Sequence, residues 1–233
     1  MSSRFFASET VANLSILQGM VSLTSRQSSE DILRSSAAGF SQAAVLGGIS
    51  MKGIVFNLLE EVVTQAHGEH VWDALLDAAG LSGSYTSLGS YPDEQMAKLV
   101  QAAANALGLP PSEVLRWFGQ QAMPRLAERY PTFFKGHPST QPFIVSVNSI
   151  IHPEVRKLYA GADVPLFDFA DAPDGAMLMG YRSPRKLCAL AQGFIEGAAV
   201  HFHETAAVEH LACMHDGDAE CKMRIVFSTD GVQ

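Results

Sequence analysis

A short segment in the second half of the chain combines three side chains that donate hydrogen bonds. Tyr181, Ser183 and Arg185 occur in the sequence Y-R-S-P-R. A Ser-Pro pair is typical of a helix start, so we expect Ser183 to cap a helix that begins at Pro184 and leaves backbone N–H groups free for an anion. The planar guanidinium of Arg185 matches a carboxylate. The segment is therefore a candidate anion site, although an ordinary strand-to-helix turn with a solvated arginine would have the same sequence.

Three cysteines lie late in the chain, and an odd number is unsuited to a disulfide framework. His210 precedes Cys213 by three residues, Cys221 follows after a turn, and Cys188 lies upstream. Thiolate and imidazole groups suit a closed tetrahedral zinc site, so a Cys3His ligand set is available. Free buried thiols or a redox pair explain the same residues equally well. Three neighbouring histidines are competing ligands that we expect either to be solvated or to contact the ligands without binding the metal: His201, His203 and His215.

A further histidine, His152, lies beside an apolar helix face. Apolar residues recur at steps of three and four within residues 142–159. They are Ile144, Val147, Ile151, Val155 and Leu158. Pro153 disfavours helical geometry at His152. A lone histidine in this position is more often a hydrogen-bonded core residue than a ligand, so the surroundings must decide its role.

The elements that must position these residues divide the chain into two halves. Hydrophobic periodicity, Pro starts and Gly ends predict helices in the first half over residues 54–65, 70–79, 93–107 and 111–130. In the second half, the patterns predict strands over 166–170, 176–182, 208–214 and 221–227, with a helix over 184–205. The predicted fold class is α+β: a helical N-terminal subdomain packed on a C-terminal subdomain with an antiparallel sheet and helices.

The first 50 residues differ in composition from the rest. They are rich in serine, and helical periodicity begins abruptly after Met51. We expect residues 1–50 to be an N-terminal extension or a start assigned too early, with a flexible regulatory tail as the alternative. Residues 51–227 are expected to form one domain, and residues 228–233 a C-terminal tail.

Charge and hydropathy exclude several classes of partner. The 233 residues hold 24 acidic and 16 basic side chains, a formal net charge of -8, so no net positive field attracts nucleic acid or an anionic membrane surface. No segment approaches the roughly 20 apolar residues of a membrane span, and the first residues lack the pattern of a secretory signal. We therefore expect a cytoplasmic protein.

Taken together, five short motifs resemble the H-NOX family, the haem-nitric oxide/oxygen binding domains. The motifs are MKGIVF at 51–56, FGQQ at 118–121, KLY at 157–159 after His152, Y-x-S-x-R at 181–185 and EGAA at 196–199. The resemblance covers residues 51 to about 227 and implies the H-NOX fold with bound haem b. It implies that His152 is the proximal ligand of the haem iron, that Tyr181, Ser183 and Arg185 bind the propionates, and that Pro165 presses on the porphyrin. Pro153 directly after the ligand departs from the usual family pattern.

The same resemblance bears on the choice of gas. Oxygen-binding members carry a tyrosine on the helix after Y-x-S-x-R, and the corresponding residue here is Leu190. Phe194 and three further apolar residues are the expected neighbours, and none donates a side-chain hydrogen bond. The further residues are Val55, Leu58 and Leu126. An apolar pocket of this kind favours nitric oxide and disfavours oxygen.

The cysteines resemble those of stand-alone bacterial H-NOX proteins that hold a structural zinc ion. In this chain, the resemblance implies the zinc ligands Cys188, His210, Cys213 and Cys221. The implied function is a nitric oxide sensor without catalytic activity. Binding of the gas releases His152 and regulates a separate signalling partner, a histidine kinase or a cyclic-di-GMP enzyme. Two alternatives remain: a zinc/thiol redox sensor, and a haem protein that binds oxygen.

Overall fold

The structure is a computed structural model that describes residues 50–229. The expected N-terminal extension therefore falls outside the described residues except for Ser50, which opens strand β1 (Ser50–Lys52). Of the expected C-terminal tail, only residues 228 and 229 are described, and they continue strand β6 (Cys221–Thr229). Within this part of the chain, no helix combines the length and the apolar character that a membrane crossing requires.

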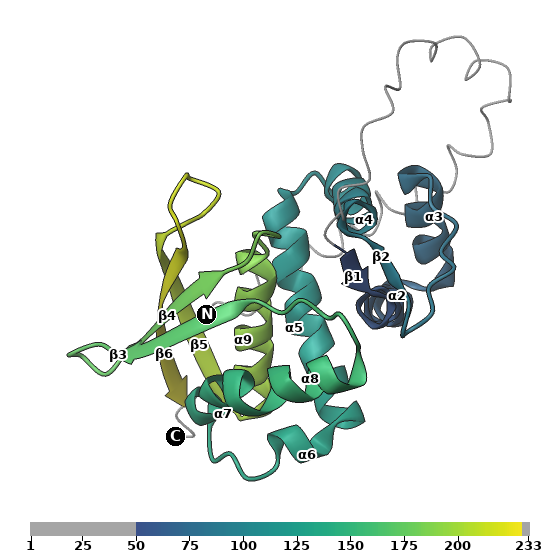
Figure 1. Cartoon of the computed structure of the whole chain (residues 1–233). Helices are drawn as coiled ribbons and strands as arrows, with labels where there is room; N and C mark the ends of the chain where they lie inside the picture. The colour runs from purple at the N-terminus through teal and green to yellow at the C-terminus, as the bar shows by residue number, and fades with distance from the viewer. Residues whose placement is uncertain (1–49, 230–233) are drawn as a thin grey trace, which may run out of the picture.

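The first half is helical, as predicted. Helices α2 (Gly53–His67), α3 (Glu69–Ala79) and α4 (Asp93–Leu107) gather at one end of the molecule, beside the small antiparallel pair of β1 and β2 (Ser90–Pro92) (Figure 1). Helix α2 begins without a side-chain cap; instead the N–H groups of Gly53 and Ile54 donate to the carbonyls of Gly89 and Ser87. A Cβ on Gly53 would lie 2.0 Å from the carbonyl oxygen of Thr86, so only glycine fits here.

Two long helices form the centre of the molecule. Helix α5 (Pro111–Arg129) packs against α9 (Cys188–His201). The two backbones approach closely because glycines lie at the crossing: a Cβ on Gly193 would lie 2.0 Å from the carbonyl oxygen of Arg116, and one on Gly119 2.6 Å from that of Leu190. The glycines of the FGQQ and EGAA motifs thus serve helix packing, since Gly197 meets α5 in the same way.

The second half supplies a four-stranded antiparallel sheet. Strands β3 (Leu166–Asp171), β4 (Met177–Arg182), β5 (Glu204–Ala212) and β6 lie in the order β3-β4-β6-β5. Alternate residues of β4 and β6 are buried and paired, for example Met179 with Met223 and Tyr181 with Cys221. Helix α9 lies between this sheet and α5 (Figure 1). The predicted α+β fold class is confirmed.

The helix that carries His152 is continuous, contrary to the expectation drawn from Pro153. Short helices α6 (Pro131–Phe134) and α7 (Thr140–Ser146) lead into a π-helical turn, η2 (Val147–Ile151), and then α8 (His152–Leu158). His152 has helical angles, φ -61° and ψ -40°, and its N–H donates to the carbonyl of Val147, five residues earlier. The π turn places Pro153 at the start of a new regular segment, where its missing N–H costs little.

The helix predicted from Pro184 begins later. Residues 183–187 form a turn, and α9 starts at Cys188 and ends at His201 instead of Thr205. The hydroxyl oxygen of Tyr181 accepts a hydrogen bond from the N–H of Leu187 at 2.9 Å, which stabilises this turn in place of a helix. Lys186 has a positive φ of 51°, which a helix does not allow. Ser183 is therefore not a helix cap, and no helix N-terminus lies at the predicted anion site.

Candidate functional site

One cavity of about 390 Å³ brings the predicted cofactor residues together. Its volume falls within the range of about 300–1,000 Å³ that is usual for ligand sites. Residues from both halves of the chain line it, although they are separated by more than a hundred positions. The predicted residues among them are His152, Pro165, Tyr181, Ser183, Arg185, Leu190 and Phe194.

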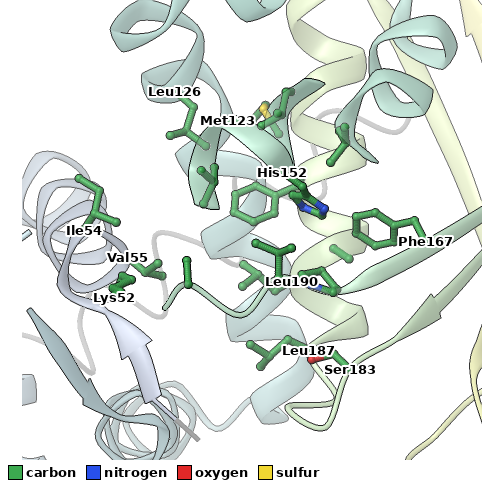
Figure 2. A pocket seen from close by; sticks show the side chains of 18 of the residues that line it. Lys52, Ile54, Val55, Met123, Leu126, His152, Phe167, Ser183, Leu187 and Leu190 are labelled. Atoms are coloured by element: carbon green, nitrogen blue, oxygen red, sulfur yellow. The ribbon is translucent and has the colours of Figure 1, made fainter. Parts of the chain in front are cut away.

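The walls contributed by α2, α5 and α9 are entirely apolar. None of their side chains that line the cavity donates a hydrogen bond. These residues are Ile54, Val55, Leu58, Met123, Leu126, Leu190, Ala191, Phe194 and Ile195. Figure 2 shows Ile54 and Val55 on one side of the cavity and His152 on the other. The prediction of an apolar surrounding for Leu190 agrees with this arrangement.

The apolar stripe of the His152 helix also faces the cavity. All five residues of the stripe line it, and no residue of η2 or α8 is fully buried. Those five residues are Ile144, Val147, Ile151, Val155 and Leu158. The helix therefore directs its apolar face toward the cavity instead of packing it fully into the protein core.

His152 is poised as a neutral nitrogen ligand. Its ring stacks on Phe167 with 5.4 Å between ring centroids and 25° between planes (Figure 2). Burial, aided by the positive charge of Arg156, lowers the pKa of His152 to about 4. Within residues 50–229 no hydrogen bond engages its ring nitrogens. A lone pair is thus available to a metal at neutral pH.

Tyr181 and Ser183 present hydroxyl groups at the edge of the cavity. Each accepts a backbone N–H: Tyr181 Oη from Leu187, and Ser183 Oγ from Arg185 at 3.3 Å. Burial raises the pKa of Tyr181, so its hydroxyl stays protonated. Both hydroxyl hydrogens can therefore donate to a carboxylate.

Arg185 has a largely buried side chain that is hydrogen-bonded within the protein, unlike a solvated arginine. Only 8% of its side chain is exposed. Its Nε donates to Asp93 Oδ2 at 2.7 Å, its Nη1 to the carbonyl and carboxylate of Asp163 at 2.8 and 3.1 Å, and its Nη2 to the carbonyl of Ser50 at 2.8 Å. One Nη2 hydrogen of the guanidinium remains. Arg185 thus joins three distant segments and keeps one donor for a further acceptor.

The carboxylates around Arg185 were not recognised in the sequence. Asp93 marked only the start of α4, and Asp163 lay in a loop. Burial raises the pKa of Asp93 even though Arg185 opposes the shift, and Asp93 Oδ1 is buried without a partner among the described residues. Two tyrosines that line the cavity, Tyr130 and Tyr159, were also missed as site residues. Burial, together with the neighbouring Tyr130, raises the pKa of Tyr159 to about 12.

A second group of residues, here called the thiol cluster, consists of Cys188, Cys213 and Cys221. Their sulfur atoms all lie within 4.8 Å of one another, and Cys213 Sγ lies 3.9 Å from each of the other two. Thiolates around a tetrahedral zinc ion at about 2.3 Å lie about 3.8 Å apart, so the spacing fits zinc. Burial raises the pKa of Cys188 and of Cys221, so a bound cation is needed to hold them as thiolates.

His210 is not brought into the thiol cluster. Its Nε2 lies 2.9 Å from Oε1 of Gln192, and strand β5 has an irregularity in register between His210 and Ala212. Burial, with the charge of Arg116 nearby, lowers the pKa of His210, which keeps its ring neutral. His215 is occupied elsewhere, with its Nε2 2.7 Å from the carbonyl oxygen of Lys186.

Known proteins share this fold. The sequence profile of the haem-NO-binding family matches residues 52–210. An H-NOX protein from Shewanella oneidensis, solved in its Fe(II)NO state, is 33% identical over 77% of this chain and 100% of its own, with a TM-score of 0.72. A mutant H-NOX protein from K. algicida, solved unliganded as Fe(II), is 25% identical over 77% of this chain and 98% of its own, with a TM-score of 0.69. No curated protein matches the chain.

Proposed function

Because this chain belongs to the haem-NO-binding (H-NOX) family, whose domains are haem-based gas sensors and not enzymes, we propose that it senses nitric oxide and discriminates against oxygen. One observation carries the proposal: a neutral imidazole, that of His152, faces an apolar cavity whose edge holds the donors of Tyr181, Ser183 and Arg185.

The donor set fits haem b. The macrocycle is flat and apolar, and the walls from α2, α5 and α9 are apolar. His152 would hold the iron, while the hydroxyl hydrogens of Tyr181 and Ser183 and the remaining N–H of Arg185 would hold the two propionates. Pro165, in the loop before β3, would pack against the macrocycle. When bound, haem would supply the ferrous iron to which the gas binds.

Selectivity would follow from the apolar wall. Bound oxygen is held well when a donor stabilises its partial negative charge, whereas nitric oxide needs no such donor. Leu190 and Phe194 offer none, and neither do the neighbouring residues of α2 and α5. This composition supports nitric oxide as the ligand.

The signal would pass through the His152 helix. η2 and α8 have no fully buried residue and line the cavity, so their packing would respond to what the cavity holds. Release of His152 from the iron would free α8 and allow the helical half to shift against the sheet half. A separate protein, a histidine kinase or a cyclic-di-GMP enzyme, would respond to that shift.

Zinc bound by the thiol cluster would have a structural role. Cys188 follows Leu187, whose N–H is bonded to Tyr181, and Lys186 Nζ donates to the carbonyl of Met214 beside Cys213. A metal here would brace the turn that carries the propionate donors. A thiol redox sensor is the second candidate, favoured by the same sulfur spacing; it predicts that peroxide releases the metal and alters partner activity without a change at the haem.

Absorption spectroscopy tests the proposal. Haem-supplied protein, reduced without air, is expected to give a five-coordinate ferrous spectrum that ignores oxygen and shifts with nitric oxide. His152→Ala should lose this spectrum, whereas His70→Ala, at an exposed position outside the cavity, should keep it. Failure to retain haem, or a stable oxygen complex, would contradict the proposal.

A further inference from the structure

A polar network outside the haem cavity connects α5, α9 and β5. Arg116 Nε donates to Glu196 Oε2 at 2.8 Å, and Gln192 Nε2 donates to Glu196 Oε1 at 2.9 Å. The amide oxygen of Gln192 then meets Nε2 of His210 at 2.9 Å. Gln120 also donates to Glu196, at 2.7 Å. Only 11% of the Glu196 side chain is exposed, so the carboxylate at the centre of the network is largely shielded from water, whereas His210 at its end is exposed.

The network determines which nitrogen of His210 carries hydrogen. The Glu196 carboxylate, paired with Arg116, accepts hydrogen bonds and donates none, so Gln192 must turn its NH₂ group toward it. The amide oxygen of Gln192 therefore faces His210, and a carbonyl oxygen only accepts. Nε2 of His210 must donate, which leaves the lone pair of the neutral ring on Nδ1.

The same network lies beside the thiol cluster. Cys188, Gln192 and Glu196 follow one another at steps of four along α9, and side chains at that spacing are neighbours, with roughly 5–6 Å between their Cβ atoms. Gln192, which bonds His210, therefore lies one helical turn from Cys188. It also precedes Cys213 by only three residues along the chain.

We propose that Gln192 and Glu196 are positioning residues for zinc: they hold His210 as the Nε2–H tautomer. Its Nδ1 lies outside the thiol cluster here and would become the fourth ligand when the ring closes on a zinc ion held by the three thiolates. The inference rests on the zinc site proposed above. Metal-ligating histidines generally donate their other N–H to an oxygen acceptor, and loss of that acceptor typically weakens metal binding about 10- to 100-fold. Arg116 stabilises the carboxylate at the far end of this chain of hydrogen bonds.

Zinc affinity tests the proposal. The full chain, with thiols reduced and air excluded, competes for zinc ion with a chromogenic chelator. Gln192→Ala is expected to weaken binding about 10- to 100-fold, and His210→Ala at least as much. The double variant should bind no more weakly than His210→Ala, because Gln192 acts only through that ring. Gln120→Ala, which removes a bond to the same carboxylate but leaves His210 paired, is the control and should stay within about threefold of the parent.

A second readout reports the ring itself. Nitrogen NMR of histidine-labelled protein should show His210 protonated at Nε2 in the parent, with that assignment lost in Gln192→Ala. A merely structural role for Gln192 would not move the tautomer.

The outcomes separate the two proposals. If His210→Ala weakens zinc binding but Gln192→Ala does not, the positioning role is wrong and the zinc site stands. If only cysteine variants weaken binding, the positioning role is wrong and the thiols hold zinc without His210. If the parent chain binds no zinc, both the site and the inference fall.

Discussion

Replacing Leu190 with tyrosine would place one hydrogen-bond donor in the apolar wall. Leu190 lines the cavity from α9, and only 8% of it is exposed. A tyrosine ring at this position would extend into the cavity. Its hydroxyl would then donate to a gas bound on the side of the haem opposite His152. A hydrogen bond to a charged acceptor contributes about 1.5–3 kcal/mol. Since about 1.4 kcal/mol is tenfold in affinity, oxygen binding should tighten about 10- to 150-fold.

The assay is an oxygen titration of the reduced, haem-loaded protein, followed by absorbance. Leu190→Phe is the matched control, because it adds the same ring without the hydroxyl. It separates the hydrogen bond from the change in cavity shape, which could itself cost about 1–3 kcal/mol of stability. Nitric oxide affinity should change little in either variant, since that ligand does not depend on a donor.

Equal oxygen affinity in Leu190→Tyr and Leu190→Phe would refute the reasoning. It would mean that the hydroxyl does not reach the bound gas, or that the gas does not bind on the side of the cavity formed by α9. Tight oxygen binding by the unaltered protein would refute the stated basis of selectivity more directly.

Three other changes test the packing and electrostatics of the same region. Arg185→Gln should lower the free energy of unfolding in urea by about 2 kcal/mol, because it leaves the partly buried Asp93 carboxylate without its ion-pair partner. Asp93→Asn should lower it by less than about 1 kcal/mol, because burial already raises the pKa of Asp93. Equal costs would contradict this reasoning. Gly193→Ala should lower the thermal midpoint and reduce the free energy of unfolding by at least about 2 kcal/mol, although alanine normally favours helices. The reason is that its Cβ would lie 2.0 Å from the Arg116 carbonyl oxygen. A stabilised variant would show that the two helices can separate. In haem-free protein, the pKa of His152 is about 4 when folded and 6.5 when unfolded, so the unfolded chain binds more protons between these values. The free energy of unfolding should therefore rise by about 2 kcal/mol from pH 4 to pH 6.5, and His152→Ala should remove that rise.

Local signals in the sequence were enough for most of the fold. The helix predicted over residues 93–107 has those bounds in the structure, because acidic residues mark its start and Gly108 adopts the left-handed conformation that ends it. The strands around the turn at Asp174 were likewise marked by alternation and turn residues. Such signals act over a few residues, and therefore a linear pattern contains them.

The candidate site residues also came from the sequence, through motifs that resemble a family. The motifs selected His152 and the Y-x-S-x-R side chains, and the structure places all of them on one cavity. The motif pattern does not explain its glycines, whereas the close approach of α5 and α9 does. The sequence alone thus predicted the family, the candidate residues and most of the elements that position them.

Tertiary structure decided which groups meet. The apolar stripe of the His152 helix has the spacing of a core face, yet it lines a cavity. Arg185 is held by Asp93, 92 positions away, and by the backbone of Ser50, 135 positions away. The helix predicted to start at Pro184 starts at Cys188, because a hydrogen bond to the Tyr181 hydroxyl stabilises a turn before it. These outcomes depend on contacts between segments that only the folded chain brings within a few ångströms, and the free energy of such contacts overrides local preference.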